Sequence, residues 1–445
     1  MIRRTVALTS LSVVGIAALV LLARGVFSGV INAEAPDERG GAEEFFAREM
    51  RDRAHQIGVW ERAAARDTSS ALALAQLAGL YLQRSREVGD YADVLRAEAA
   101  ARRSLAIRTN RNARTFSTLV AALVAQHRFA DALPVARQMV AMDPELPSYR
   151  SLLGEIQMEV GDYAGARASF EAVRGATASP AVAARIARWD ELNGRDQDAR
   201  RLLNNTLLTI VDRVDVPSEQ VAWFFLRLGE HDLRLARWSD ARAAFRLGLD
   251  RVPEDHRLLA AMAKLEAMRG RWRRAIDYGE RAIVTVLDPA TLGILADAHA
   301  AIGDGAKAAD LRRALEVSVR AQPGAYHRAW SHFLLDHGRV NDVARLVEQD
   351  IESRRDVYAH DLLAWTRYRQ GRLVEATAAS REALSLGTGD ALPYYHAGMI
   401  ASARGDRAAA RRHLSRALRI NERFHHAHAD SARAALKALG GEVDR

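Results

Sequence analysis

The sequence contains no cysteine, and it has only ten prolines and three lysines in 445 residues. The absence of cysteine excludes disulfides, thiolate zinc sites, iron–sulfur clusters and a lipoprotein anchor. The scarcity of proline permits long helical runs, and the apolar content of 49% is well above that of disordered chains. The formal charge of +8 comes almost wholly from arginine. We expect the arginines to lie on solvent-exposed faces of helices, because acidic residues accompany them along the whole chain.

The N-terminus carries one long run without a charge. Residues 1–4 form a basic segment, and the nineteen residues from Thr5 to Ala23 hold no charged side chain. At the helical rise this run covers about 28 Å, close to the hydrocarbon thickness of a bilayer. We therefore expect a transmembrane signal anchor over residues 5–25.

A cleaved signal peptide is the alternative interpretation of this segment. The nearest cleavage site, at 31–33, has Ile31 where a small residue is preferred, which favours an uncleaved anchor. With the basic segment held inside by the positive-inside rule, the rest of the chain is expected outside the cytoplasm, on the periplasmic side of a bacterial membrane. Cleavage would instead give a secreted or periplasmic protein.

Two short segments separate this run from the rest of the chain. Residues 26–42, rich in glycine and acidic side chains, indicate a linker. Residues 43–69 place Phe46, Ile57 and Trp60 at helical spacing, which predicts an amphipathic helix. That helix can pack on the element that follows or lie on a membrane surface, and the sequence leaves both open.

A small residue recurs along the chain at nearly constant intervals. The positions are Ala97, Ala132, Ala166, Ala199, Ala241, Ala275, Ala308, Val343, Ala376 and Ala410. The intervals are 33 to 35 residues, with one of 42. A fixed period near 34 predicts stacked helical hairpins. Glycine stands five residues before most of these positions, where a helix has to end in a left-handed conformation.

The array resembles the tetratricopeptide repeat (TPR) family. The resemblance rests on residues such as Leu153-Gly154, Tyr163, Ala166 and Phe170 in one unit, and Leu228-Gly229, Trp238, Ala241, Phe245 and Pro253 in another. It implies an all-α, right-handed superhelical solenoid of about ten hairpins over residues 70–420, in a bacterial membrane-anchored or exported protein. Residues 421–445 are expected to form a C-terminal capping helix and tail that cover the end of the array.

No catalytic or cofactor motif is present. The chain lacks a dinucleotide fingerprint after a strand, a nucleophile elbow and a zinc-protease helix, so we expect neither an enzyme nor a bound cofactor. His425 and His428 share a helix face and are the candidate metal ligands, although solvated histidines without a nearby carboxylate are the favoured interpretation. Nucleic acid is not expected as a partner, because the basic residues form no block interleaved with aromatics.

The family resemblance also implies where a partner would bind. First-helix side chains of such repeats line a concave groove that takes an extended or helical peptide, and aromatic residues there are typical interface anchors. Here those positions are Trp223, Leu226, Glu230, Leu233, Tyr358, Asp361, Trp365, Tyr368, Tyr395 and Met399. For each aromatic residue, packing within or between hairpins is an equally good interpretation.

These features together favour a membrane-tethered, non-catalytic scaffold or assembly factor that binds a partner protein or peptide in its groove. A secreted soluble carrier or metal-handling TPR module is the alternative. The sequence sets neither the identity of the partner nor the oligomeric state.

Overall fold

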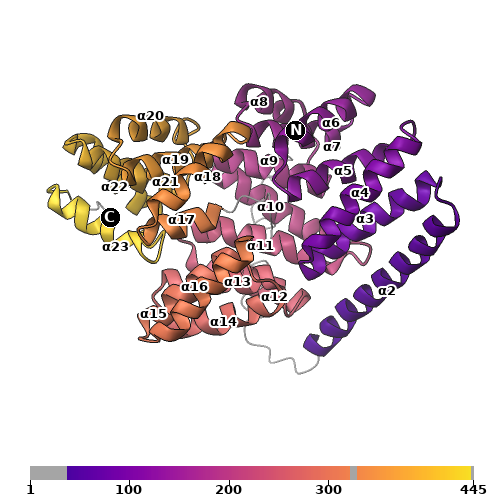
Figure 1. Cartoon of the computed structure of the whole chain (residues 1–445), viewed down its shortest axis with the longest axis horizontal. Coiled ribbons are helices and arrows are strands. Elements are labelled where there is room, and N and C mark those ends of the chain that lie inside the picture. Colours follow the sequence, from indigo (N-terminus) through magenta and orange to yellow (C-terminus); the bar gives the residue numbers. More distant parts are fainter. Residues whose placement is uncertain (1–37, 321–327, 442–445) are drawn as a thin grey trace, which may run out of the picture.

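The computed structural model describes residues 38–320 and 328–441. Every regular element in these ranges is an α-helix, and Figure 1 shows how the helices follow one another. The predicted transmembrane segment 5–25 and most of the predicted linker lie outside the described residues. Among the helices that are described, none is both long and apolar enough to cross a membrane.

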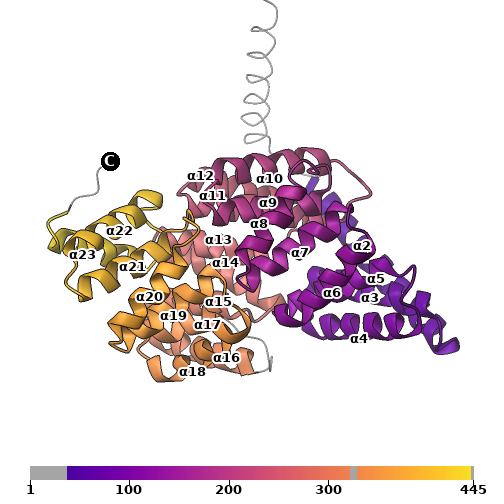
Figure 2. The same ribbon diagram turned by 90° about the horizontal axis from the view of Figure 1, so that it is seen from above.

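The helices pair into ten antiparallel hairpins over the described part of the chain, as the period of the sequence predicts. The pairs are α3 (Ala71–Val88) with α4 (Tyr91–Ile107), α5 (Ala113–Ala125) with α6 (Phe129–Met142), α7 (Pro147–Glu159) with α8 (Tyr163–Ala172), α9 (Pro180–Leu192) with α10 (Asp196–Ile210), α11 (Ser218–Arg234) with α12 (Trp238–Arg251), α13 (His256–Met268) with α14 (Trp272–Thr285), α15 (Pro289–Ala301) with α16 (Gly305–Arg320), α17 (Arg328–Asp336) with α18 (Val340–Ser353), α19 (Val357–Arg369) with α20 (Leu373–Ala383), and α21 (Ala391–Ala403) with α22 (Arg407–Ile420). Figure 2 shows α3–α5 and α21–α23 at opposite ends of the molecule.

A left-handed residue ends the first helix of most hairpins. In α19 this residue is Gly371, with φ +75°, and the following Arg372 N–H donates to the carbonyl of Arg367 at 2.9 Å, which satisfies an otherwise unpaired helix-end acceptor. Two hairpins place other residues at the same point, His127 with φ 58° and Ala236 with φ 59°. The turn is therefore set by the position in the repeat, and glycine is its least strained occupant.

Small residues allow the two helices of a hairpin to approach closely. A methyl group added at Gly229 would lie 2.3 Å from Cε1 of Phe245, and Ala241 is fully buried. Because a larger side chain at either position would force the helices apart, the recurring small residues of the sequence are explained by packing.

Helix α2 (Glu38–Arg66) precedes the hairpins and packs on them. Ile57 belongs to the apolar cluster of α3 to α7, and the Tyr81 hydroxyl donates to Glu61 at 2.6 Å. The helix therefore packs on the repeats rather than standing free. Helix α2 begins at Glu38, within the predicted linker 26–42. A glycine lowers the stability of a helix by only about 1 kcal/mol, and good helix-forming residues follow the glycines of this segment.

The C-terminal cap is shorter than the predicted helix. Helix α23 covers only His428–Ala438, and residues 421–427 form a turn. The Asn421 side chain causes this break, because its Nδ2 donates to the carbonyl of Leu233 at 3.0 Å and its Oδ1 accepts from the Arg423 N–H at 2.9 Å. The turn is fixed to α11, and the helix can start only after it.

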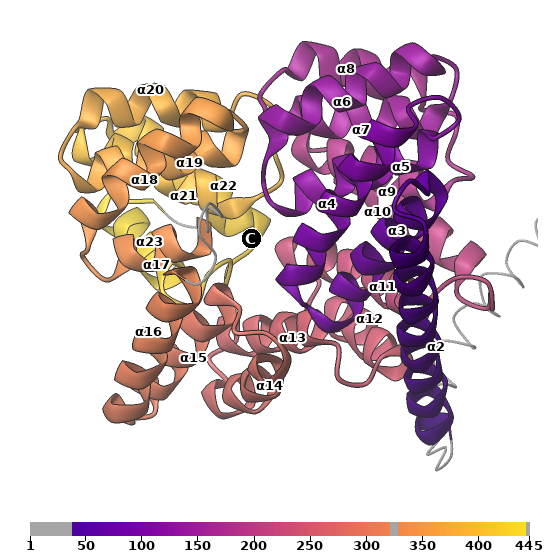
Figure 3. The ribbon, with the colours of Figure 1, turned by 45° about the vertical axis from the view of Figure 1, so that its right-hand side comes forward.

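The array closes on itself. Arg354, which follows α18, makes an ion pair of 2.6 Å with Glu159 at the end of α7, and the Val357 N–H donates to the Tyr163 hydroxyl at 2.6 Å. Val357 is 1% exposed and belongs to the same apolar cluster as Trp189. Figure 3 shows α19 and α20 beside α7 and α8, with α11 to α16 below them. The C-terminal half therefore covers part of the concave side, whereas the sequence predicts an open groove.

Candidate functional site

A cavity of about 580 Å³ occupies the concave side of the array. First helices of four successive hairpins, α9, α11, α13 and α15, supply most of its wall. The C-terminal part completes the wall with Tyr358, Ala391 and Phe424. The volume is that of a ligand pocket and not of a packing defect. The cavity exists because the array closes, since its lining residues come from segments that are far apart in the sequence.

Glu191 organises the charges on one side of this cavity. Its carboxylate lies 3.0 Å from Nη2 of Arg227 and 2.9 Å from Nδ1 of His231, while Nη1 of Arg188 lies 3.5 Å away. Burial by itself would raise the pKa of Glu191, but Arg227 and the hydrogen bond with His231 lower it far below its ordinary value. The carboxylate is therefore ionised, and it holds two first helices, α9 and α11, together.

Two cationic side chains of the lining have nitrogen donors that are not fully used. Arg234 Nη1 is buried without a hydrogen-bond partner in the described part of the chain. Lys264 lines the cavity and is exposed, and no ion pair with it occurs among the described residues. A buried donor without a partner costs about 1–3 kcal/mol, so an acceptor brought by a ligand would be favoured here.

Four of the predicted partner-binding residues line the cavity: Leu226, Glu230, Leu233 and Tyr358. The two leucines contribute apolar wall, with 7% and 4% of their surface exposed. Tyr358 receives the Arg188 guanidinium over its ring at 5.2 Å. The structure thus brings these residues together from α11 and α19, which are well separated along the chain.

The remaining predicted partner-binding residues lie elsewhere. Trp223 packs edge-on against Phe224 at 5.0 Å, and Met399 packs against the C-terminal apolar core. Neither of them lines the central cavity. A role of these two residues in binding a partner outside the cavity stays a prediction.

Asp361, Trp365, Tyr368 and Tyr395 belong to a buried cluster of aromatic and histidine side chains. Asp361, Trp365 and Tyr395 are each 3% exposed, and Tyr368 stacks on Trp365 with ring centroids 4.8 Å apart. For these residues the structure favours packing between hairpins over contact with a partner. Asp361 also lines a smaller cavity of about 270 Å³.

The cluster includes histidines that the sequence did not indicate. His396 is fully buried and its Nδ1 lies 2.9 Å from Asp361. Burial, followed by the proximity of His396, lowers the pKa of His332 to about 4. These histidines come from α17 and α21, so no spacing within one helix could have revealed the group.

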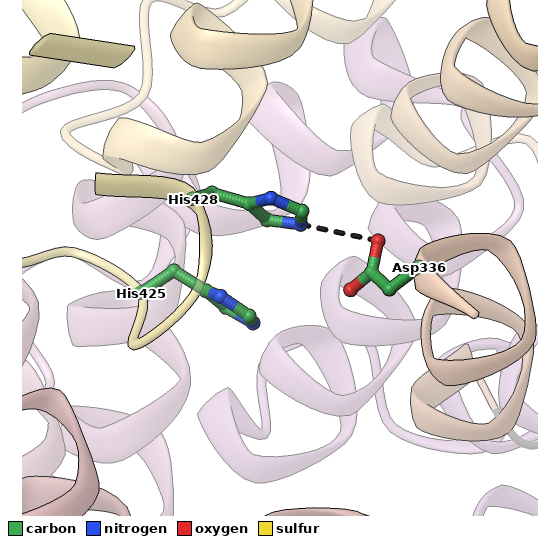
Figure 4. Close-up of side chains that lie close together, drawn as sticks. All are labelled: Asp336, His425 and His428. Atoms are coloured by element: carbon green, nitrogen blue, oxygen red, sulfur yellow. Dashed lines mark ion pairs between the residues drawn. The ribbon is translucent and has the colours of Figure 1, made fainter. Parts of the chain in front are cut away.

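The two histidines that the sequence did indicate lie close to a carboxylate. Figure 4 shows His425, from the turn, and His428, the first residue of α23, converging on Asp336 at the end of α17. His428 Nε2 is 3.1 Å from Asp336 Oδ1. The sequence predicts that these histidines are solvated and lack a nearby carboxylate. Both predictions are wrong, because Asp336 lies close to them and neither histidine is freely solvated. Burial, and then His426 and His428, lower the pKa of His425 well below its usual value.

Comparison with known proteins agrees with the repeat assignment. The tetratricopeptide repeat family model matches residues 123–188. Similar solved structures include the human IFIT1 dimer with PPP-AAAA, at 14% identity and a TM-score of 0.44, covering 69% of this chain and 72% of that chain. Another is yeast Tom70, at 11% identity and a TM-score of 0.33, covering 83% and 95% of the two chains.

A tetratricopeptide repeat protein from Parabacteroides merdae is also similar, at 14% identity and a TM-score of 0.35, covering 55% of this chain and 93% of that chain. Similarities at this level carry no argument about function. No curated protein matches the chain.

Proposed function

We propose that this chain, whose repeats are tetratricopeptide repeats, is a non-catalytic scaffold that binds a segment of a partner protein in its central cavity. The observation that carries the proposal is the composition of the cavity wall. Apolar side chains such as Leu226 and Leu233 stand beside Arg234, whose buried Nη1 has no hydrogen-bond partner among the described residues. Such a wall suits a ligand that combines an apolar side chain with oxygen acceptors.

The charges of the wall indicate the sign of the ligand. Glu191 is already neutralised by Arg227, and Arg257 is held by Glu219 at 2.6 Å and by Asp255. Lys264 has no such acidic partner among the described residues. A segment that carries a carboxylate is therefore favoured over a basic one.

The scarcity of lysine provides a direct test. Lys264 is the only one of the three lysines that lines the cavity, while Lys307 and Lys437 are exposed outside it. An amine-reactive crosslinker applied to the native complex, followed by mass spectrometry, is expected to join the partner to Lys264. Ala260→Trp, which adds a bulky side chain to the cavity wall, should reduce this crosslink, while modification of the exposed Lys307 by the reagent serves as the internal control.

Two results would contradict binding in the cavity. One is a partner that crosslinks only to Lys307 or Lys437. The other is a crosslink at Lys264 of undiminished yield in Ala260→Trp, provided that circular dichroism shows this variant to be folded. Reversal of charge in Lys264→Glu should weaken capture, whereas Lys307→Glu should leave it unchanged.

We further propose that residues 5–25 tether the protein to a membrane, with the repeats outside the cytoplasm and acting in assembly within a bacterial envelope. The uncharged run after two arginines supports this proposal. Fractionation should recover the chain with membranes, and external protease should degrade the repeats in intact spheroplasts. A mature chain that begins after residue 30 and is recovered as a free protein would favour the exported alternative.

A further inference from the structure

We propose that Asp336, His425 and His428 bind one divalent first-row metal ion, of which Zn²⁺ is the representative, and that the ion clamps the C-terminal cap onto α17. The inference does not depend on what occupies the central cavity. It rests on three ligand-type side chains that converge from three different elements (Figure 4).

The distances are compatible with one shared ion. One potential ligand atom from each of the three side chains lies within 4.8 Å of the other two. A tetrahedral zinc site has bonds of about 2.0–2.2 Å, which places its ligand atoms roughly 3.3–3.5 Å apart. His428 Nε2 and Asp336 Oδ1, at 3.1 Å, lie within a few tenths of an ångström of this spacing. The larger movement, of about an ångström, is required of His425.

The three side chains are positioned before any ion binds. The His425 and His428 rings lie nearly parallel with centroids 4.5 Å apart, and Tyr395 stacks on His428 at 5.0 Å. Asp336 Oδ1 is buried, and its contact with His428 Nε2 at 3.1 Å lacks good hydrogen-bond geometry. A cation between the two side chains would give this oxygen a stronger partner. The local cost is small, since the Ala427 N–H donates only a long 3.2 Å bond to His425 Nδ1.

The donor set selects the class of metal. Two imidazoles and one carboxylate, without a thiolate, suit Zn²⁺, Co²⁺ and Ni²⁺. Mg²⁺ and Ca²⁺ prefer sites built wholly from oxygen ligands and should bind poorly. Three protein ligands also leave a fourth position, which water would occupy in the isolated protein.

The ion would reinforce contacts that already close the array. His426 Nε2 lies 2.9 Å from Asp297 of α15, and Asn421 Nδ2 donates to Leu233 O at 3.0 Å. The turn is thus attached to α11 and α15, and the proposed ion adds α17 to these attachments. Metal binding should therefore raise the thermal stability of the C-terminal hairpins, because the ion binds the folded arrangement only.

The test uses the full chain without a polyhistidine tag, stripped of metal with chelator. Titration calorimetry with Zn²⁺ should show one ion per chain, and Co²⁺ should give the visible absorption of a tetrahedral site. Asp336→Asn keeps the shape of the side chain but replaces a strong ligand, and it should weaken Zn²⁺ binding at least tenfold. His425→Ala and His428→Ala should abolish the Co²⁺ spectrum. The melting temperature should rise with Zn²⁺ in the wild type and not in these two variants.

His413→Ala is the matched control, because His413 lies on α22 beside Tyr394 and away from the three ligands. This variant should bind Zn²⁺ as the wild type does. Absence of stoichiometric Zn²⁺ binding to the wild type would overturn the proposal. Equal affinity in the wild type and in folded Asp336→Asn would also overturn it. Loss of binding in His413→Ala would point to a site elsewhere.

Discussion

The imidazole of His396 lies flat against the indole of Trp365, with ring centroids 4.3 Å apart and an angle of 19° between the planes. The contact joins α21 to α19, and both side chains are almost fully buried. Trp365 is therefore a packing residue between successive hairpins. Its burial explains why an aromatic residue stands at a position that resembles a groove-lining one in the sequence.

Trp365→Ala should destabilise the chain by about 3–5 kcal/mol, because it leaves a large cavity between two hairpins. Urea unfolding followed by circular dichroism measures the loss. Val374→Ala is the control, since Val374 is 75% exposed and its truncation should change stability by less than about 0.5 kcal/mol. A Trp365→Ala chain of normal stability that fails to capture a partner would contradict the packing role.

Ala236→Gly should stabilise the hairpin of α11 and α12. Ala236 has φ 59°, a left-handed conformation that disfavours a Cβ atom by about 1–2 kcal/mol, and part of this gain is offset by the entropy of glycine in the unfolded chain. We expect a net increase of roughly 0.5–1 kcal/mol in the free energy of unfolding. The reciprocal change, Gly371→Ala, should lower the free energy of unfolding by a similar amount. If both substitutions changed it in the same direction, the explanation would be refuted.

Arg354→Ala should open the closed array without unfolding the hairpins. The Arg354 guanidinium pairs with Glu159, lies 4.8 Å from the Phe129 ring and reaches His127 at 3.2 Å, so it joins the C-terminal half to two N-terminal hairpins. Small-angle scattering should show a larger radius of gyration at unchanged helical content.

Arg355→Ala is the neighbouring control for this experiment, because the exposed side chain of Arg355 makes no ion pair within the described residues. Its scattering curve should match that of the wild type. If Arg354→Ala is as compact as this control, the closure depends on the apolar contacts of Val357 instead.

Asp350→Asn should make the stability of the chain less dependent on pH. Burial raises the pKa of Asp350 from 3.8 to about 6, against the opposing effect of Arg328 and Arg354. The folded state therefore binds a proton more tightly than the unfolded state, and stability falls as pH rises from about 4 to about 6. Above pH 6 the variant should be more stable than the wild type by roughly 1–3 kcal/mol.

Thermal or urea unfolding at pH 4 and pH 7.5 measures this difference, which should nearly vanish at the lower pH. Glu352→Gln removes an exposed carboxylate from the same helix, and it controls for the change in net charge. An Asp350→Asn chain that is destabilised at pH 7.5 would show that the carboxylate is needed in its ionised form.

The sequence by itself determined the repeating hairpin. Small residues at Ala166 or Ala241, and a turn five residues earlier, act within a single hairpin, so their spacing is visible without a structure. The same locality explains why four residues of the cavity, on α11 and α19, could be named from their place in the repeat. Patterns of neighbouring residues do not predict contacts between distant hairpins.

Only the tertiary structure decided how the array ends and what its concave side becomes. Small rotations between successive hairpins accumulate until Arg354 meets Glu159 and His428 meets Asp336, and no short-range pattern encodes that sum. The end of the C-terminal helix was likewise set from a distance, by the bond from Asn421 to Leu233. Contacts between residues 90 to 200 positions apart depend on the curvature of the whole chain, and curvature is a property of the packed structure.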